Sequence, residues 1–460
     1  MQLGLLTALV AAIVISENAP REPVPDATWR LALALACSLT VVLPAAVGSV
    51  AVARAIDRDA RRRVTWLHSF ARFKQAHLIA WLLAVGVTLY GLSWPQVVRY
   101  NWGLDRAILI KDLLVLAPIW VTWLLSWAAF YEVDHAVYRA AHRDEQPGAG
   151  AAVTGFTPRA QFVWMHARHY LGLCVLPVLA LLACQDVATL VAPDWQQSRG
   201  AWLVYLVPLC ALIVAFPHLL SRIWNTATLP ASPLRVRLSN LTAHMGVRCR
   251  DFKIWQTDRQ VLNAAIAGLF PSVRYVFVTD ALLLYLRDDE LEAVVAHELG
   301  HIRRRHLLLR LLLLGLPAWI AANMQTFSPQ IADLVTRWQV GSVGDAALPG
   351  HLVLAGFTFA LATFALGRYS RLLEHDADLC VFEVGRAETF IAAIDRLSFL
   401  CDDRRQRATW LHPSTAARVQ LLQRALGDPQ TAREFRARVE RVNRLLISAW
   451  LAAPLAAFIG

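Results

Sequence analysis

Charged residues are scarce in this chain of 460 residues: they make up 17% of the sequence, whereas hydrophobic types make up 57%. An average soluble domain has about 25% charged and about 45–50% apolar residues. A compact water-soluble body of this size could not cover its surface with so few charges, so most of the chain must meet lipid. Disordered, collagen-like and coiled-coil proteins are excluded by the same composition. We therefore predict a polytopic membrane protein.

Cysteine pairs are also lacking. The seven cysteines include no CxxC motif and their number is odd, which argues against both a disulfide framework and a cysteine-ligated zinc site. The net charge is +11, but the arginines lie mainly between apolar runs, as the positive-inside rule describes. Because no basic segment is interleaved with aromatic residues, we expect no nucleic-acid partner.

Long apolar runs, in contrast, are frequent. A membrane-spanning helix needs about 20 mostly apolar residues. Seven runs approach or reach this length, namely 31–53, 76–94, 108–130, 170–191, 202–220, 307–324 and 351–366. Two terminal runs are marginal, 3–15 and 445–459. We interpret the first as an anchor or short span, since it lacks the basic segment of a signal peptide. We expect seven to nine spans.

The charges of the loops orient these spans. Arginine is frequent in 54–75, 131–169, 221–306 and 367–443, and rare in 95–107, 193–200 and 326–350. A single orientation of the spans places every arginine-rich loop on the same side of the membrane. By the positive-inside rule this side is the cytoplasm, and both long polar segments lie there. The predicted domains are a multi-span region (1–220), a first polar part (221–306), a transmembrane hairpin (307–366), a second polar part (367–444) and a C-terminal apolar segment (445–460).

The first polar part contains the clearest chemical motif. β-Branched and aromatic residues predict strands at 251–256, 261–268 and 274–280. Asp288, Asp289 and Glu290 then favour the start of a helix, and that helix contains the sequence HELGH, residues 297–301.

The spacing in HELGH suits a metal ion. Side chains at i and i+4 project from one helix face, so His297 and His301 can bind the same ion. Glu298 lies beside them, where a carboxylate can take a proton from water. A polar helix surface that carries scattered histidines is the alternative.

A third ligand is needed for a catalytic zinc site, which leaves one position open for water. In the second polar part, Glu374 and Asp378 are again four residues apart. Glu374 can complete a His-His-Glu site, and Asp378 can accept a hydrogen bond from a ligand histidine and so orient it. His375 and Asp376 are weaker candidates. We interpret His306, which follows three arginines, as an interfacial residue rather than a catalytic one.

These motifs together resemble a known family. HELGH, SRLLEHDAD (370–378) and HPSTAAR (412–418) occur in this order, and the chain is similar in them to the integral-membrane zinc metallopeptidases that include the CAAX prenyl endopeptidase and the HtpX heat-shock protease. The similarity starts earlier, in NAAIAGLFPSVRYVFVTDALL (263–283), and covers roughly residues 229–424. It implies a mainly α polytopic membrane protein with a small α+β zincin-like metallopeptidase domain that a transmembrane hairpin splits.

The resemblance also implies roles for individual residues. One zinc ion per chain would be bound by His297, His301 and Glu374, with Glu298 as general base and then proton donor, and Asp378 as the residue that orients a ligand. Asn263 and Ala264 match a strand that pairs with substrate backbone. His412 and Arg418 match a downstream pair at the site, where His412 would stabilise the oxyanion and Arg418 would contact substrate. An ordinary helix start at His-Pro-Ser is the alternative for this pair.

The expected function is that of a zinc metalloendopeptidase that cleaves membrane-associated or lipidated proteins at the cytoplasmic face of the bilayer, in a bacterial inner membrane. Two other functions remain open. A signal-responsive sensor protease would also carry HExxH in a membrane, although the outer loops here are short. A transporter or scaffold would hold the metal structurally, but structural zinc normally has four Cys or His ligands.

Overall fold

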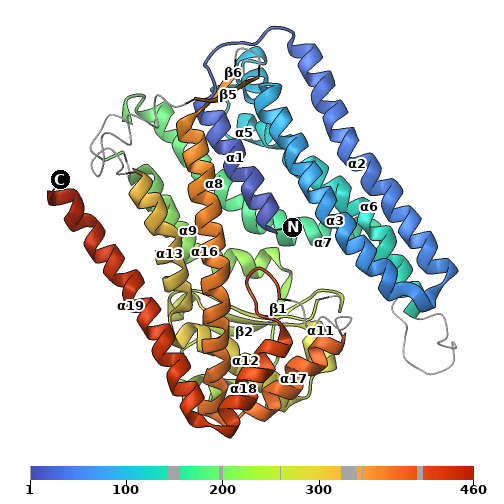
Figure 1. The fold of residues 1–460 in the computed structure, drawn as a ribbon, viewed down its shortest axis with the longest axis vertical. Coiled ribbons are helices and arrows are strands. Elements are labelled where there is room, and N and C mark those ends of the chain that lie inside the picture. Colours follow the sequence, from blue (N-terminus) through green and yellow to red (C-terminus); the bar gives the residue numbers. More distant parts are fainter. Residues whose placement is uncertain are drawn as a thin grey trace. The chain divides into compact units, whose positions relative to one another are not determined.

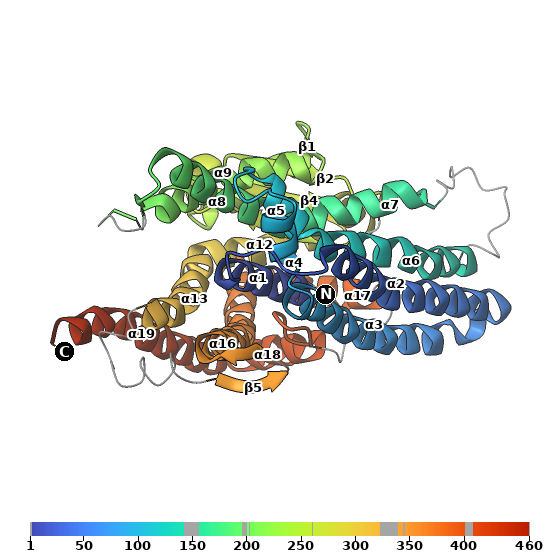
Figure 2. The same ribbon diagram turned by 90° about the horizontal axis from the view of Figure 1, so that it is seen from above.

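The computed structural model describes residues 2–141, 156–195, 200–201, 203–259, 261–322, 339–343, 346–400 and 408–459. The chain divides into two compact units, Met1–Trp224 and Asn225–Gly460. Most of the described residues are helical (Figures 1 and 2). The predicted fold class, a mainly α membrane protein with a small α+β part, is confirmed.

The first unit consists of helices. Its elements are α1 (Gln2–Asn18), α2 (Ala27–Arg58), η1 (Ala60–Arg62), α3 (Arg63–Gly86), η2 (Val87–Gly91), α4 (Trp94–Gln96), η3 (Val97–Asn101), α5 (Ile110–Val115), α6 (Ala117–Ala141), α7 (Arg159–His166), η4 (Ala167–Leu171), α8 (Gly172–Val191) and α9 (Leu203–Ile223). Helices α2, α3 and α6 lie side by side in both views (Figures 1 and 2). Trp81 and Trp123 meet in their shared core at 4.9 Å between ring centroids.

Four described helices are long and apolar enough to cross a membrane, namely Ala27–Arg58, Arg63–Gly91, Gly172–Val191 and Leu203–Ile223. The predicted run 31–53 lies within the first of them, and most of the runs 76–94, 170–191 and 202–220 lies on the other three. Gly4–Asn18 and His306–Pro317 are shorter apolar helices. The predicted run 108–130 is divided between α5 and α6, and the end of the run 307–324 lies outside the described residues.

The second unit is built around a four-stranded sheet with the order β1-β2-β4-β3. Its strands are β1 (Thr226–Thr228), β2 (Asp251–Trp255), β3 (Ala264–Ala267) and β4 (Tyr275–Thr279). All five residues of β4 are buried, because this apolar strand lies between a parallel neighbour, β2, and an antiparallel one, β3. Among the described residues, β3 pairs on one side only and is consequently an edge strand.

The other elements of the second unit are mainly helices. They are α10 (Pro233–His244), η6 (Pro271–Val273), α11 (Asp280–Tyr285), α12 (Asp288–Arg303), α13 (His306–Ala322), α16 (Gly350–Cys380), η7 (Val381–Val384), α17 (Ala387–Leu400), α18 (Thr415–Gly427) and α19 (Pro429–Ile459), and a hairpin of β5 (Gln339–Val343) and β6 (Ala346–Pro349) precedes α16. Leu309, Leu373 and Leu446 form a separate core where α13, α16 and α19 meet. The main core joins β4 and α12 to α17 and α18.

Candidate metal centre

Helix α12 holds the HELGH motif in a rigid position. The helix begins where predicted, and the side chain of Glu290 accepts a hydrogen bond from the backbone N–H of Arg287 at 3.0 Å, which closes the first turn. Leu291, Val295 and Leu299 are buried in the main core. Because these residues anchor the helix on one side, the two histidines of the motif keep a fixed orientation.

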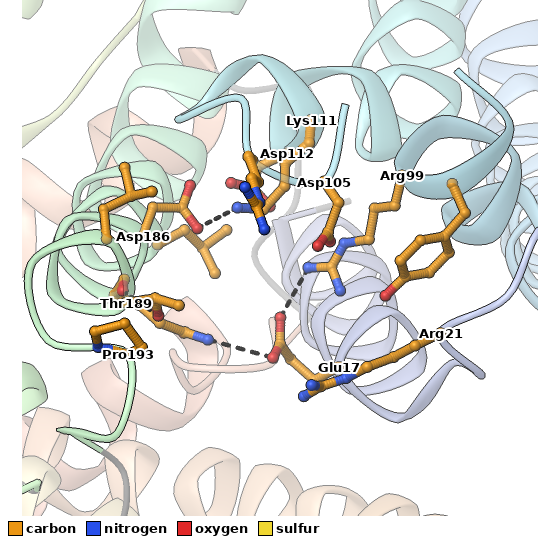
Figure 3. Close-up of a pocket in the computed structure, with 14 residues that line it drawn as sticks. Glu17, Arg21, Arg99, Asp105, Lys111, Asp112, Asp186, Thr189 and Pro193 are labelled. Atoms are coloured by element: carbon orange, nitrogen blue, oxygen red, sulfur yellow. Dashed lines mark hydrogen bonds and ion pairs between the residues drawn. The ribbon is translucent and has the colours of Figure 1, made fainter. Parts of the chain in front are cut away.

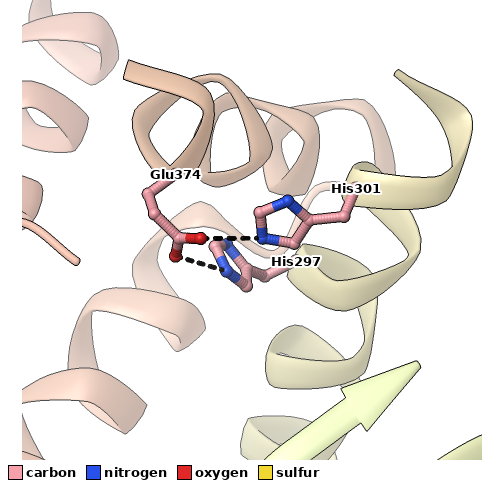
Figure 4. A group of neighbouring side chains, drawn as sticks. All are labelled: His297, His301 and Glu374. Carbon is pink, nitrogen blue, oxygen red and sulfur yellow. Dashed lines mark ion pairs between the residues drawn. The ribbon is translucent and has the colours of Figure 1, made fainter. Parts of the chain in front are cut away.

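His297, His301 and Glu374 converge although the chain separates Glu374 from the two histidines (Figure 4). One ligand atom from each residue lies within 4.8 Å of the other two. The Nε2 atom of His297 is 3.6 Å from Glu374 Oε2, and Nε2 of His301 is 3.3 Å from Oε1. The predicted trio is therefore brought together by helices α12 and α16.

Asp378 orients His297. Its Oδ1 atom lies 2.9 Å from His297 Nδ1, so Nδ1–H donates to the carboxylate and Nε2 turns toward Glu374. Arg418 donates to both oxygens of Asp378, from Nη2 at 2.6 Å and from Nε at 2.9 Å. Burial acts to raise the pKa of Asp378, but the Arg418 guanidinium and the His297 hydrogen bond hold it well below its usual range.

A second chain of hydrogen bonds orients His301. Its Nδ1 atom is 2.8 Å from Nδ1 of His306, whose Nε2 is 3.1 Å from Asp376 Oδ2. If His306 donates from Nε2 to the carboxylate, its Nδ1 accepts from His301, which leaves Nε2 of His301 free for a metal ion. The interpretation of His306 as an interfacial residue is wrong, because its side chain is 0% exposed and contacts a candidate ligand.

Glu374 is surrounded by donors. Arg310 donates from Nη2 to Oε1 at 3.0 Å, and His412 donates from Nδ1 to Oε2 at 2.8 Å. Burial acts to raise the pKa of Glu374, but the hydrogen bonds of His297 and His412 hold it well below its usual range. Glu374 is consequently ionised at neutral pH and available as an oxygen ligand.

Glu298 lies between the two histidines on α12 and is partly buried. Burial raises the pKa of Glu298 to about 7, with a further contribution from the charge of Glu374. A cation held by the neighbouring ligand atoms would favour the carboxylate form and lower this pKa. The position of Glu298 and its basicity suit a group that accepts a proton.

The chemistry of the donor set fits a metal ion. Two imidazoles present Nε2 atoms with their orientation fixed, and a carboxylate completes three protein ligands, as in catalytic zinc sites. Burial acts to lower the pKa of His297, yet hydrogen bonds to Asp378 and Glu374 raise it to about 9. A metal ion would therefore displace a proton from His297 when it binds. His375 and Asp376 do not belong to the group of converging ligand atoms.

The remaining predicted site residues differ in their exposure and in their contacts. Asn263 is exposed just before β3, and its backbone carbonyl accepts from Thr279 N–H at 3.1 Å. Ala264 is buried at the start of the strand. The side chain of His412 is 56% exposed while it contacts Glu374. Arg418, predicted to contact substrate, is bound to Asp378, which favours a positioning role.

Sequence reasoning missed Arg310 and the link through His306. Arg310 lies within an apolar run, where an isolated charge is unusual and signals a buried partner. That signal alone could have identified the residue. The role of His306 depends on how α13 turns back after α12, which local sequence does not reveal.

Comparison with known proteins finds similarity in this part of the chain. Residues 229–426 match the family model described as Peptidase family M48. The CAAX prenyl protease 1 homolog of Arabidopsis thaliana is 23% identical over 202 residues, which cover 43% of this chain and 47% of that protein. The Protease HtpX homolog of Tropheryma whipplei is 28% identical over 171 residues, or 37% of this chain and 48% of that protein. The resemblance predicted from the motifs is thus confirmed.

These matches are partial in length. The chain spans about half the length of the curated relatives it matches. Among solved structures, a crystal structure of S. mikatae Ste24p is 14% identical, with a TM-score of 0.46, over 83% of this chain and 99% of that one.

Proposed function

We propose that this chain is a membrane-embedded, zinc-dependent endopeptidase that hydrolyses peptide bonds of membrane-associated or lipidated proteins. The observation that carries the proposal is the convergence of His297, His301 and Glu374, in which Asp378 and His306 orient the two imidazoles. Three protein ligands beside a glutamate are typical of catalytic zinc and unlike the four ligands of structural zinc. The match to Peptidase family M48 supports the same activity.

The residues of the site perform complementary steps in hydrolysis. When bound, a zinc ion would supply a Lewis acid that polarises the scissile carbonyl and lowers the pKa of water toward about 7. Glu298 takes a proton from the attacking water as the new C–O bond forms, and gives it to the amine nitrogen as the C–N bond breaks. Asp378 and Arg418 keep His297 in position throughout.

His412 can assist the reaction only in one protonation state. Its Nδ1–H already donates to Glu374, so Nε2 can donate to a developing oxyanion only when the imidazole carries a second proton. Its exposed side chain leaves Nε2 within reach of substrate. We therefore assign to His412 stabilisation of the oxyanion.

The substrate would bind as an extended strand. In the part of the chain that the structure describes, β3 pairs with β4 on one side only, and α12 packs against β3. A free strand edge beside the metal centre can form backbone hydrogen bonds with a peptide of any sequence. The region of Asn263 and Ala264 is the proposed docking edge.

The chain would lie in a bacterial inner membrane with this site on the cytoplasmic side. The support comes from the arginine-rich loops, which the positive-inside rule assigns to the cytoplasm, and from the apolar helices of the chain. A site at the bilayer surface suits substrates that are themselves held in the membrane by a lipid or a spanning helix.

Replacing Glu298 with glutamine tests the proposed activity. We expect Glu298→Gln to retain zinc but to lower kcat/KM for a peptide substrate by at least about 100-fold, because the proton acceptor is lost. The matched control is Glu388→Gln, which changes an exposed glutamate on α17. Full proteolysis by Glu298→Gln would contradict the assigned role, and equal losses in both variants would point to a general loss of structure.

A further inference from the structure

The first unit contains a charged pocket of about 450 Å³ that the proposed peptidase chemistry does not use (Figure 3). It lies among the end of α1, the segment 99–112 and the end of α8. Four cationic and four carboxylate side chains line it, namely Arg21, Arg99, Arg106, Lys111, Glu17, Asp105, Asp112 and Asp186. The lining charges therefore balance. Its size is that of typical small-molecule sites.

Two ion pairs account for half of these charges. Arg99 donates from Nη2 to Glu17 Oε1 at 3.0 Å, and Gln185 donates to the other oxygen at 3.2 Å (Figure 3). Lys111 pairs with Asp186, whose second oxygen accepts from the backbone N–H of Leu109 at 3.4 Å. Both carboxylates are thus fully engaged and form the fixed wall of the pocket.

Asp112, unlike Glu17 and Asp186, has a carboxylate oxygen without a hydrogen-bond donor in the described part of the chain. It is only 4% exposed, and its Oδ2 atom has no hydrogen-bond partner among the described residues. A buried carboxylate oxygen without a donor is costly, so Asp112 is a candidate binding residue. The adjacent Lys111 is already held by Asp186. Lys111 and Arg99 lie close enough to act on the charge of Asp112, but neither donates to Oδ2, so this oxygen lacks a hydrogen-bond donor among the described residues.

The mouth of the pocket carries positive charge that no ion pair with a carboxylate neutralises among the described residues. Arg21 and Arg106 are exposed, and no ion pair joins either of them to a carboxylate in the part of the chain that the structure describes. Asp105 offsets only one of the two charges. An anionic group at the mouth and a cationic group at Asp112 would together complete the charge pattern.

We propose that this pocket binds a small zwitterion whose primary ammonium contacts Asp112 and whose anionic end faces Arg21 and Arg106. A primary ammonium offers three N–H donors, which suits a single unpaired carboxylate. A divalent metal ion would need about six oxygen ligands, and a quaternary ammonium would need an aromatic cage. Two sources share the proposed chemistry: an amino acid or short peptide, and a phosphoethanolamine lipid headgroup.

Calorimetry on the purified full chain in detergent tests the proposal with defined probes. Dialanine represents the peptide source and glycerophosphoethanolamine the headgroup source. N-acetyl-dialanine lacks the ammonium, and dialanine amide lacks the carboxylate. We expect at least one of the two zwitterions to bind, and we expect binding of dialanine to be lost on acetylation and weakened in the amide.

Variants assign the binding to the pocket. Asp112→Asn should raise the Kd of the bound zwitterion about ten-fold or more, because a hydrogen bond to a charged group is lost, and Arg106→Gln should raise it less. The matched control Asp59→Asn changes an exposed carboxylate at the end of α2 and should leave the Kd unchanged.

The stability of the variants makes the result interpretable. Asp112→Asn should melt cooperatively and no lower than the unchanged protein, since it removes a buried, unpartnered charge. The proposal is overturned if neither zwitterion binds. It is also overturned if Asp112→Asn and Arg106→Gln both bind the zwitterion as strongly as the unchanged protein does. Should Asp112→Asn fail to fold, Arg106→Gln and the acetylated probe still decide. These measurements require no peptidase activity, so their failure leaves the proposed function untouched.

Discussion

At the scale of single residues, each candidate ligand is held by a partner that fixes which nitrogen faces the metal position. Asp378 holds Nδ1 of His297, and Arg418 holds Asp378. His306 and Asp376 do the same for His301. Such outer partners raise the basicity of a ligand and reduce the ordering that metal binding requires. We therefore expect the affinity of the candidate site for a metal ion to depend on residues that would not contact the ion.

His306→Phe tests this dependence. The substitution removes the acceptor of His301 Nδ1–H while a ring of similar size fills the buried space. We expect the Kd for zinc to rise about 10- to 100-fold, as measured by competition with a chromophoric chelator, with His306→Gln intermediate because its amide can both accept and donate. His244→Phe, which changes an exposed histidine at the end of α10, serves as the control. An unchanged Kd in His306→Phe would show that the link to Asp376 has no part in metal binding.

At the scale of elements, the site depends on how closely α12 approaches α16. Gly300 stands at the contact: a Cβ atom added there would lie 3.0 Å from Cys380 Cβ and 3.2 Å from the carbonyl oxygen of Ala377. α16 runs without interruption from Gly350 to Cys380. The helix that begins in the predicted hairpin thus carries Glu374 to the histidines, and the predicted boundary between 366 and 367 lies inside it.

Gly300→Val should separate the two helices. We expect a loss of about 1–3 kcal/mol of stability from overpacking, seen as a lower Tm in detergent, together with weaker zinc retention. Gly427→Val is the matched control, because nothing lies within 4 Å of a Cβ at that helix end. Equal Tm values for the two variants would contradict the close approach of α12 and α16.

The elements also show what the sequence could predict. Strands β2, β3 and β4 and the start of α12 follow from alternation, β-branched residues and first-turn acids, which are local signals. His297, His301 and Glu374 could be selected because catalytic zinc restricts the ligand types and their spacing. The partners of Arg310 and His306 could not be predicted, since Glu374 and Asp376 lie more than 60 residues away in the chain. The resemblance implies that Arg418 contacts substrate. Its hydrogen bonds to Asp378 depend on the tertiary structure, which the sequence does not reveal.

At the scale of the whole molecule, the chain combines a helical unit with a unit that contains the candidate metal centre. The apolar run 31–53 lies within a single helix, α2, that is long and apolar enough to cross a membrane. Hydropathy could not predict the break between α5 and α6, next to the buried pair Lys111 and Asp112. Lys111 and Asp112, which interrupt the apolar pattern at the start of α5, also line the charged pocket of the first unit, where the proposed zwitterion would bind.

The central claim is that donors from two distant parts of the chain hold one metal ion. The most direct measurement is the zinc content of the purified full chain by mass spectrometry after dialysis against a weak chelator. We predict one zinc per chain in the unchanged protein and in Glu388→Ala, and almost none in His297→Ala or Glu374→Ala, because each removes one of three ligands. Undiminished zinc in Glu374→Ala would contradict the account, since α16 would then contribute no ligand to the centre.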